Sequence, residues 1–148
     1  MSTSPPVRPS ESLGYQINHL ARMFAAAMRD RLEEHGVVPG QFAQLLALFE
    51  HDGLTQSELC GIVQIEQATM ANTLKRMQRD GLIRKVQDPA DGRRTLIELT
   101  PRARSLEKDL MTAAREINAA ATAGMTDAEV SALLVTIETV KANLTTDR

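Results

Sequence analysis

The stretch DPADGRR, residues 88–94, places two aspartates and two arginines around a proline and a glycine. A guanidinium group binds phosphate or carboxylate through paired hydrogen bonds, and a neighbouring carboxylate can hold it in one orientation. Such a cluster suits contact with a polyanion at the tip of a loop. The alternative is a turn held by Asp and Gly chemistry whose arginines are merely solvated. Taken alone, the stretch does not decide between the two.

Basic residues are concentrated around this loop. The whole chain has a net charge of −2, whereas residues 66–94 hold seven Lys or Arg against four Asp or Glu. The flanking segments 1–65 and 95–148 are both net acidic. A basic patch on a mildly acidic body is one footprint of a docking surface for a polyanion. A solvated surface of mixed charge is the plainer interpretation.

The segment before the loop predicts a helix over about residues 66–79 with one apolar and one polar side. Met70, Leu74 and Met77 are spaced by four and three and therefore share a side. Amides can pair with adenine edges, cations can reach guanine or phosphate, and alanines permit close approach to thymine methyls. The opposite side carries residues of these kinds: Gln67, Ala68, Ala71, Asn72, Lys75 and Arg79. Polar outward faces are common, so this face alone indicates DNA contact only weakly.

The elements around these residues predict a winged helix-turn-helix. A short helix begins at TQSE, where Thr55 caps it and Glu58 completes a capping box, and VQI separates it from the helix over 66–79. Two short β-prone runs, LIRKV and TLIELT, then bracket residues 88–94 as a hairpin. A hairpin in this place is a wing, whose tip could reach the minor groove beside the helix.

Longer helices are expected on both sides of this central part. Apolar spacing predicts helices from about 13 to 34, from about 102 to 123, and from 126 onward. Their apolar stripes are wider than one 148-residue chain can cover, which favours a helical dimer over a self-contained helical layer.

The expected fold class is mainly α with a small β-hairpin wing, in which long helices form a dimerisation domain. Its expected parts are a flexible N-terminal arm at 1–10, dimerisation helices at 11–36 and 101–148, and a winged helix-turn-helix lobe at 37–100.

Composition argues against several other classes of protein. The lone cysteine rules out an internal disulfide and fits a reducing compartment. No run approaches the ~20 apolar residues of a membrane span, and the N-terminus lacks a signal-peptide stretch, so a cytoplasmic protein is expected. Phosphate-cradling loops, hydrolase motifs and metal motifs are missing from the sequence, and its three histidines fall on separate elements. We therefore expect no enzyme activity, no metal and no cofactor.

The ordered motifs resemble the core of the MarR family of winged helix-turn-helix transcriptional regulators. The resemblance rests on LTQSEL, RMQRDGLIRK, the wing pattern D-P-x-D-x-R-R and the LT before the next helix, over about residues 54–104. It implies a homodimeric regulator, expected to be a repressor, of a pseudo-palindromic operator, and importance of Asp91 and Arg93 in the wing. The chain departs from the family at Ala71-Asn72, where many members have a hydroxyl residue and Arg, and at Glu66, a weak helix cap. Base preference therefore does not transfer.

The residues expected to bind DNA lie on the two short helices and the wing: Gln56, Ser57, Gln67, Ala68, Thr69, Ala71, Asn72, Lys75, Arg76, Asp91, Arg93 and Arg94. Neighbours on a strand point oppositely, so we expect only one arginine, Arg93 held by Asp91, to enter the groove. The expected partners are double-stranded DNA and a second copy of the chain. The rival interpretation is a winged protein-interaction module that does not bind DNA.

Two further sets of residues are more simply explained as core. Cys60 lies on the apolar side of its helix, so inert packing is favoured over redox sensing. The resemblance suggests a lipophilic or phenolic small-molecule effector bound where the dimer helices meet the lobe. Core packing is again the plainer interpretation of the residues that could line such a pocket: Met23, Met28, Phe42, Phe49 and Met111.

Overall fold

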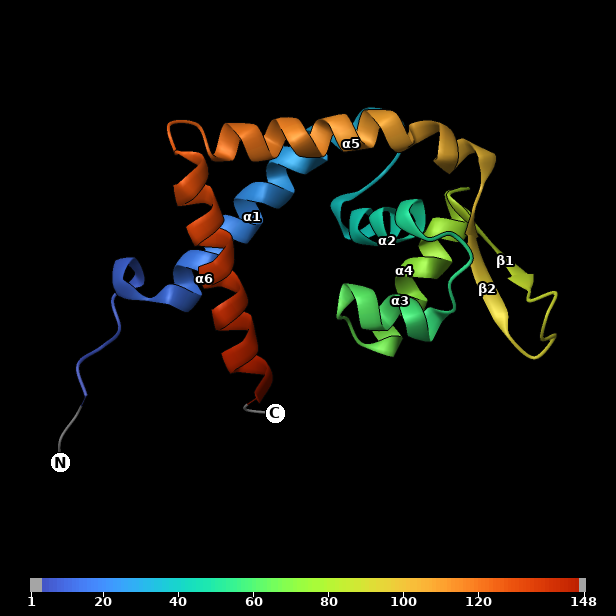
Figure 1. The fold of residues 1–148 in the computed structure, drawn as a ribbon, viewed down its shortest axis with the longest axis horizontal. Coiled ribbons are helices and arrows are strands. Elements are labelled where there is room, and N and C mark those ends of the chain that lie inside the picture. Colours follow the sequence, from blue (N-terminus) through green and yellow to red (C-terminus); the bar gives the residue numbers. More distant parts are fainter. Residues whose placement is uncertain (1–3, 147–148) are drawn as a thin grey trace. The chain divides into compact units, whose positions relative to one another are not determined.

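A computed structural model of the chain describes residues 4–146. The elements are η1 (Pro9–Glu11), α1 (Leu13–Leu32), η2 (Glu33–His35), α2 (Pro39–Glu50), α3 (Gln56–Val63), α4 (Gln67–Arg79), β1 (Ile83–Gln87), β2 (Thr95–Leu99), α5 (Pro101–Ala121) and α6 (Asp127–Thr146) (Figure 1). This order confirms the predicted fold class, mainly helical with a two-stranded wing. The chain divides into two compact units after Ala114, within α5.

The ends of the long helices differ slightly from the prediction. Pro9, near the end of the expected N-terminal arm, starts the 3-10 turn η1, which its fixed φ favours. Helix α1 ends at Leu32 because the chain tightens into η2 and reverses at Gly36, whose φ of 69° is left-handed. Residues 1–3 of the expected arm and 147–148 of the expected C-terminal helices lie outside the described residues.

An apolar core in the first unit fixes the helix-turn-helix. The predicted inward stripe of α4 is confirmed, since Met70, Leu74 and Met77 are fully buried. Burial of side chains of this size stabilises the fold by about 1.5–3 kcal/mol each. The helices packed around the stripe contribute further fully buried residues: Leu45 and Leu48 from α2 and Leu59 from α3.

Local capping sets where α3 and α4 begin. The Thr55 hydroxyl accepts from the Glu58 N–H at 3.1 Å, and the Glu58 carboxylate accepts from the Thr55 N–H at 3.0 Å. The predicted capping box is therefore present. Helix α3 ends at Val63, and its C-cap residue Gln64 adopts a left-handed φ of 61°, which turns the chain toward α4. Glu66 makes no side-chain capping bond to α4, as its weak capping propensity predicts.

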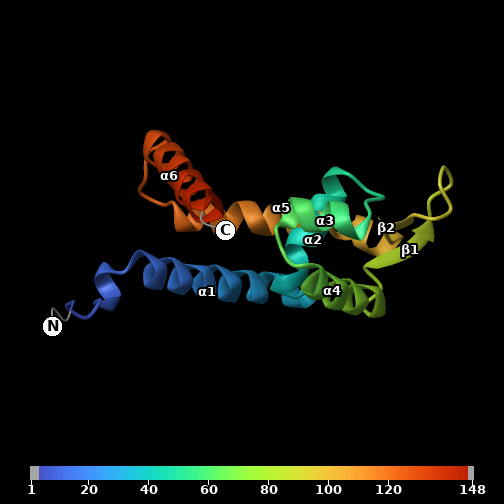
Figure 2. The same ribbon diagram turned by 90° about the horizontal axis from the view of Figure 1, so that it is seen from below.

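The wing, residues 83–99, is an antiparallel hairpin anchored at its base. Ile83 pairs with Leu99 at the base, and Gln87 pairs with Thr95 at the outer end. Ile83 and Leu99 are buried, whereas residues 89–95 are exposed. The loop between the strands, residues 88–94, is called the wing tip below. It lies at the outer end of the hairpin (Figure 1), while α1 extends away from the lobe (Figure 2).

Helices α1 and α6 carry large apolar side chains that the described residues of the chain leave exposed. Apolar residues that are 41–65% exposed recur at helical spacing on both: Leu13, Ile17, Leu20 and Met23 on α1, and Leu133, Ile137 and Leu144 on α6. Contiguous apolar faces of this kind are typical of association surfaces. Within residues 4–146, no helix is both long enough and apolar enough to cross a membrane.

Candidate nucleic-acid interface

The polar face of α4 points to solvent. All eight of its singled-out residues are exposed: Gln67, Ala68, Thr69, Ala71, Asn72, Lys75, Arg76 and Arg79. The opposite face is held by the three fully buried residues of the core stripe. Helix α4 therefore offers amide, hydroxyl and cationic groups on one side and no bulky apolar group there.

Three of the predicted residues meet where α3 and α4 begin. The Gln56 side-chain amide donates a hydrogen bond to the Gln67 side-chain carbonyl at 3.0 Å. The Gln67 side-chain amide in turn donates to the Ser57 hydroxyl at 3.4 Å. These bonds join the first turns of the two helices. They restrain the Gln67 side chain at the N-terminal end of the exposed face.

The C-terminal end of α4 is held by residues that sequence reasoning missed. The Gln41 amide, buried in α2, donates to the Asp80 carboxylate at 2.9 Å. Arg102 at the start of α5 donates to the Asp80 carbonyl at 2.8 Å and to the His35 carbonyl at 2.9 Å. The hydrogen bond from Gln41, helped by Arg79, lowers the pKa of Asp80 below its ordinary range. The only sequence signal was a glutamine within the apolar pattern of α2.

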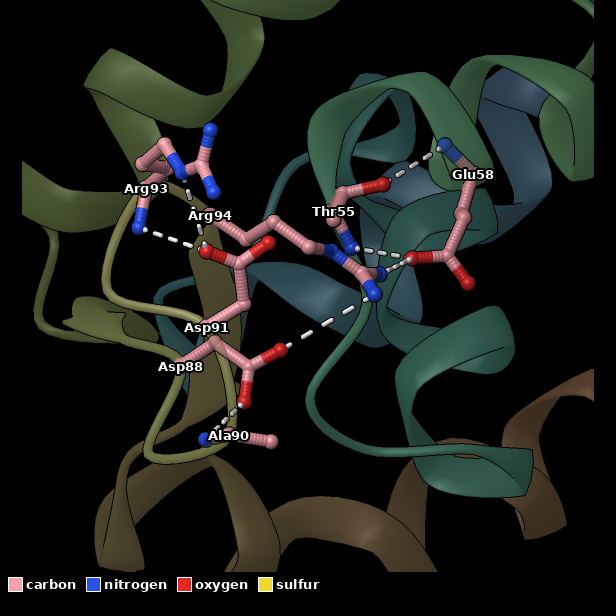
Figure 3. A network of polar contacts seen from close by, with 7 residues as sticks. All are labelled: Thr55, Glu58, Asp88, Ala90, Asp91, Arg93 and Arg94. Carbon is pink, nitrogen blue, oxygen red and sulfur yellow. Dashed lines mark hydrogen bonds and ion pairs between the residues drawn. The ribbon is translucent and has the colours of Figure 1, made fainter.

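Aspartates shape the wing tip. The Asp88 N–H donates to the Arg94 carbonyl at 2.9 Å and closes the turn. The Asp88 carboxylate accepts from the Ala90 N–H at 2.9 Å, and the Asp91 carboxylate accepts from the Arg93 N–H at 3.1 Å (Figure 3). The turn chemistry that offered the plainer interpretation of DPADGRR is thus present. It fixes the backbone from which both arginines extend.

The two arginines of the wing tip have different surroundings. Arg93 is 96% exposed, and its Nε lies 3.7 Å from an Asp91 carboxylate oxygen. Arg94 is half exposed and turns toward α3, where its Nη2 lies 3.1 Å from the Glu58 carboxylate (Figure 3). Its Nη1 lies 3.9 Å from Asp88. The side chains therefore diverge, and Asp91 lies beside Arg93, as the adjacent positions predicted.

Glu58 has a second role that the sequence did not reveal. Besides completing the capping box of α3, its carboxylate accepts from Arg94 of the wing tip. The hydrogen bonds from Thr55 lower the pKa of Glu58 below its ordinary range, and Arg94 adds to the effect. Glu58 therefore stays ionised and available to the wing at neutral pH. Because 36 residues separate it from Arg94, no local pattern could have found the pair.

The remaining candidates fall mostly in the core. Cys60 is partly buried and packs against the core, in keeping with the structural interpretation. Of the five residues considered for a pocket, Phe49 belongs to the core, Met23 on α1 is exposed, and three pack against the core: Met28, Phe42 and Met111. Among residues 4–146, no group of three His, Cys, Asp or Glu side chains could hold a metal ion.

Comparison with known proteins finds a family match over the helix-turn-helix and the wing. A family model described as "MarR family" matches residues 35–94, from the turn before α2 to the end of the wing tip. The transcriptional repressor NicR of Pseudomonas putida is 27% identical over 124 residues, which cover 78% of each chain.

Solved structures extend the likeness over nearly the whole chain. A MarR family regulator from Listeria monocytogenes, solved in complex with a 26mer DNA, matches with a TM-score of 0.83 and 26% identity, covering 92% of this chain and 91% of that one. The PcaV regulator from Streptomyces coelicolor, solved with its natural ligand, matches with a TM-score of 0.82 and 26% identity, covering 94% and 98%.

Proposed function

The chain belongs to the MarR family of winged helix-turn-helix, DNA-binding transcriptional regulators, and on that premise we propose that it is a homodimeric repressor of a pseudo-palindromic operator. Regulators of this family are not enzymes. The observation that carries the proposal is the pairing, on one lobe, of the exposed polar face of α4 with the 96% exposed Arg93 at the wing tip. Both features point to solvent, and each suits a different groove of the same duplex.

In each half-site, α4 enters the major groove and the wing tip lies over the adjacent minor groove. Gln67 and Asn72 carry amides that can pair with base edges, while Lys75 and Arg76 reach phosphates. At the start of α3, Gln56 and Ser57 face the sugar–phosphate backbone of the DNA. On α4, the small side chains of Ala68, Thr69 and Ala71 let the helix come close to the base edges. Arg93, oriented by Asp91, supplies the cation that a narrow minor groove attracts. Arg94 lies next to Arg93 at the wing tip, where its guanidinium contacts Glu58 of α3.

The exposed apolar stripes of α1 and α6 support a homodimer. A two-fold dimer would bury both stripes and present two recognition helices to half-sites about 10 bp apart. Operator symmetry would then mirror the symmetry of the protein.

Two relatives support a regulatory direction and an effector for this chain. NicR is a repressor, and PcaV was solved with its natural ligand. We extend both properties to this chain: repression, relieved by a lipophilic or phenolic small molecule. A ligand that favours one spacing of the two lobes weakens binding only if that spacing prevents both half-sites from docking together. The rival protein-interaction module accounts less well for a wing tip with an unburied arginine in a net basic segment.

Salt-dependent DNA binding and mass in solution test the proposal together. Affinity for random duplex DNA should fall linearly on a log–log salt scale, and the sedimenting species should have twice the 16.2 kDa mass of one chain. Ile137→Glu, on the apolar stripe of α6, should yield monomers and weaken operator binding. Thr139→Glu, on another side of the same exposed helix, serves as its matched control. A monomeric wild type, or an affinity for duplex DNA that does not change with salt concentration, would contradict the proposal.

A further inference from the structure

We propose that Arg94 is a positioning residue that fastens the wing tip to α3 through Glu58, and that Arg93 alone of the two arginines contacts DNA. This inference rests on the proposed function and makes it more specific, because it divides two adjacent arginines between two roles. It also assigns a role in DNA binding to the Glu58 carboxylate, which acts through its contact with Arg94.

The contacts form a continuous path from α3 to the wing tip. The Thr55 N–H holds the Glu58 carboxylate at 3.0 Å, and the same oxygen accepts from Arg94 Nη2 at 3.1 Å. The other Nη of Arg94 lies 3.9 Å from Asp88, whose side chain is only 14% exposed. Asp88 in turn holds the turn through the Ala90 N–H. Arg94 thus bridges a carboxylate of α3 and a carboxylate of the wing tip (Figure 3).

The wing tip needs such a fastening because its apolar anchors lie at the other end of the hairpin. Ile83 and Leu99 are buried at the base, while residues 89–95 are exposed. An isolated two-stranded hairpin is marginally stable in water. A bridge between the wing tip and a capped helix therefore limits how far the tip can swing, which lowers the entropy lost when it docks on DNA.

The two guanidinium groups differ in which of their N–H donors remain free to bind a phosphate. Arg94 directs both Nη groups toward carboxylates and is half exposed. Arg93 meets Asp91 through Nε only and is almost fully exposed. The paired Nη donors that bind a phosphate or line a groove are therefore turned to solvent in Arg93 and toward protein in Arg94.

The variant Glu58→Gln distinguishes the fastening of the wing tip from long-range repulsion between Glu58 and DNA, because the two predict opposite changes in DNA affinity. Removing a negative charge near DNA should tighten binding if only long-range charge mattered. Removing the carboxylate that holds Arg94 should weaken binding if the wing tip must be fastened. Glutamine can still accept from the Thr55 N–H, so the capping box of α3 is kept.

The experiment measures affinity for a random-sequence duplex in a double-mutant cycle of Glu58→Gln and Arg94→Ala, with Glu66→Gln as the control. Glu66 is an exposed carboxylate at the start of α4 that makes no capping bond. We expect Glu58→Gln to weaken binding about two- to fivefold, as for an exposed ion pair, while Glu66→Gln does not weaken it. In the Arg94→Ala background, Glu58→Gln should no longer weaken binding. Weakening that persists there, or none in the wild-type background, would overturn the proposal.

A second measurement needs no DNA. Amide hydrogen exchange of the Asp88 and Arg94 N–H groups, which are bonded within the turn, should accelerate in Glu58→Gln while the melting temperature stays constant. Unchanged exchange would contradict the fastening of the wing tip. If exchange accelerates but the wild type fails to bind DNA, the fastening stands and the proposed function fails. The fastening of the wing tip and the proposed function can therefore be refuted separately.

Discussion

Replacing Arg93 with alanine should separate DNA affinity from stability. The side chain is 96% exposed and its contact with Asp91 spans 3.7 Å. An exposed pair of this kind contributes at most about 0.5 kcal/mol to the free energy of unfolding in this geometry. The melting temperature of Arg93→Ala should therefore lie close to that of the wild type, so any loss of affinity reports on the contact with DNA.

The loss of affinity can be estimated from the symmetry of the complex. A dimer places two copies of Arg93 on one operator. If each contact contributes about 1 kcal/mol, below the usual range for charged hydrogen bonds, losing both weakens binding about 30-fold. Each lost phosphate neutralisation also reduces the slope of log affinity against log salt by about 0.9, so the slope should fall by about 1.8.

Fluorescence anisotropy across a salt series measures both quantities. The matched control is Arg84→Ala, which removes an arginine of β1 that pairs with Glu98 at 3.1 Å toward the hairpin base. That variant should bind with nearly the wild-type slope. The reasoning is refuted if Arg93→Ala leaves affinity and slope unchanged, or if Arg84→Ala reproduces its effect.

Three further predictions concern α4 and its anchor. Leu74→Ala, at a fully buried site, should lower the free energy of unfolding by about 2–5 kcal/mol in chemical denaturation, and a loss under 1 kcal/mol would contradict its core role. Asp80 has a lowered pKa in the folded state, so its stabilisation is present at neutral pH and is lost as pH falls below the ordinary aspartate range and through that lowered pKa. Thermal melts should therefore show a smaller acid loss in Asp80→Asn than in the wild type. Lys75→Ala should weaken binding to every duplex alike and reduce the salt slope; a loss confined to one sequence would instead mean base reading.

Features encoded by neighbouring residues could be predicted from the sequence. The capping box at Thr55 and Glu58 needs only a spacing of three, and the stripe of Met70, Leu74 and Met77 needs only helical periodicity. The wing followed from two short β-prone runs around turn-forming residues. Asp91 beside Arg93 likewise required no knowledge of the rest of the fold.

Contacts between distant segments could not be predicted in this way. Glu58 meets Arg94, and Gln41 meets Asp80, only after the helices have packed and the hairpin has formed. The sequence placed Arg94 beside Arg93 in the wing, but the contact of Arg94 with Glu58 of α3 becomes visible only in the structure. The small shifts at the helix ends arose from 3-10 turns, which single-residue propensities distinguish poorly from α-helix.

Selection of bound sequences from a random duplex library tests the central claim most directly. The account predicts enrichment of an inverted repeat whose half-sites lie about 10 bp apart, centre to centre, because two α4 helices in a symmetric dimer read successive major grooves. Recovery of no preferred sequence, or of a single site without a repeat, would contradict a dimeric, operator-specific regulator.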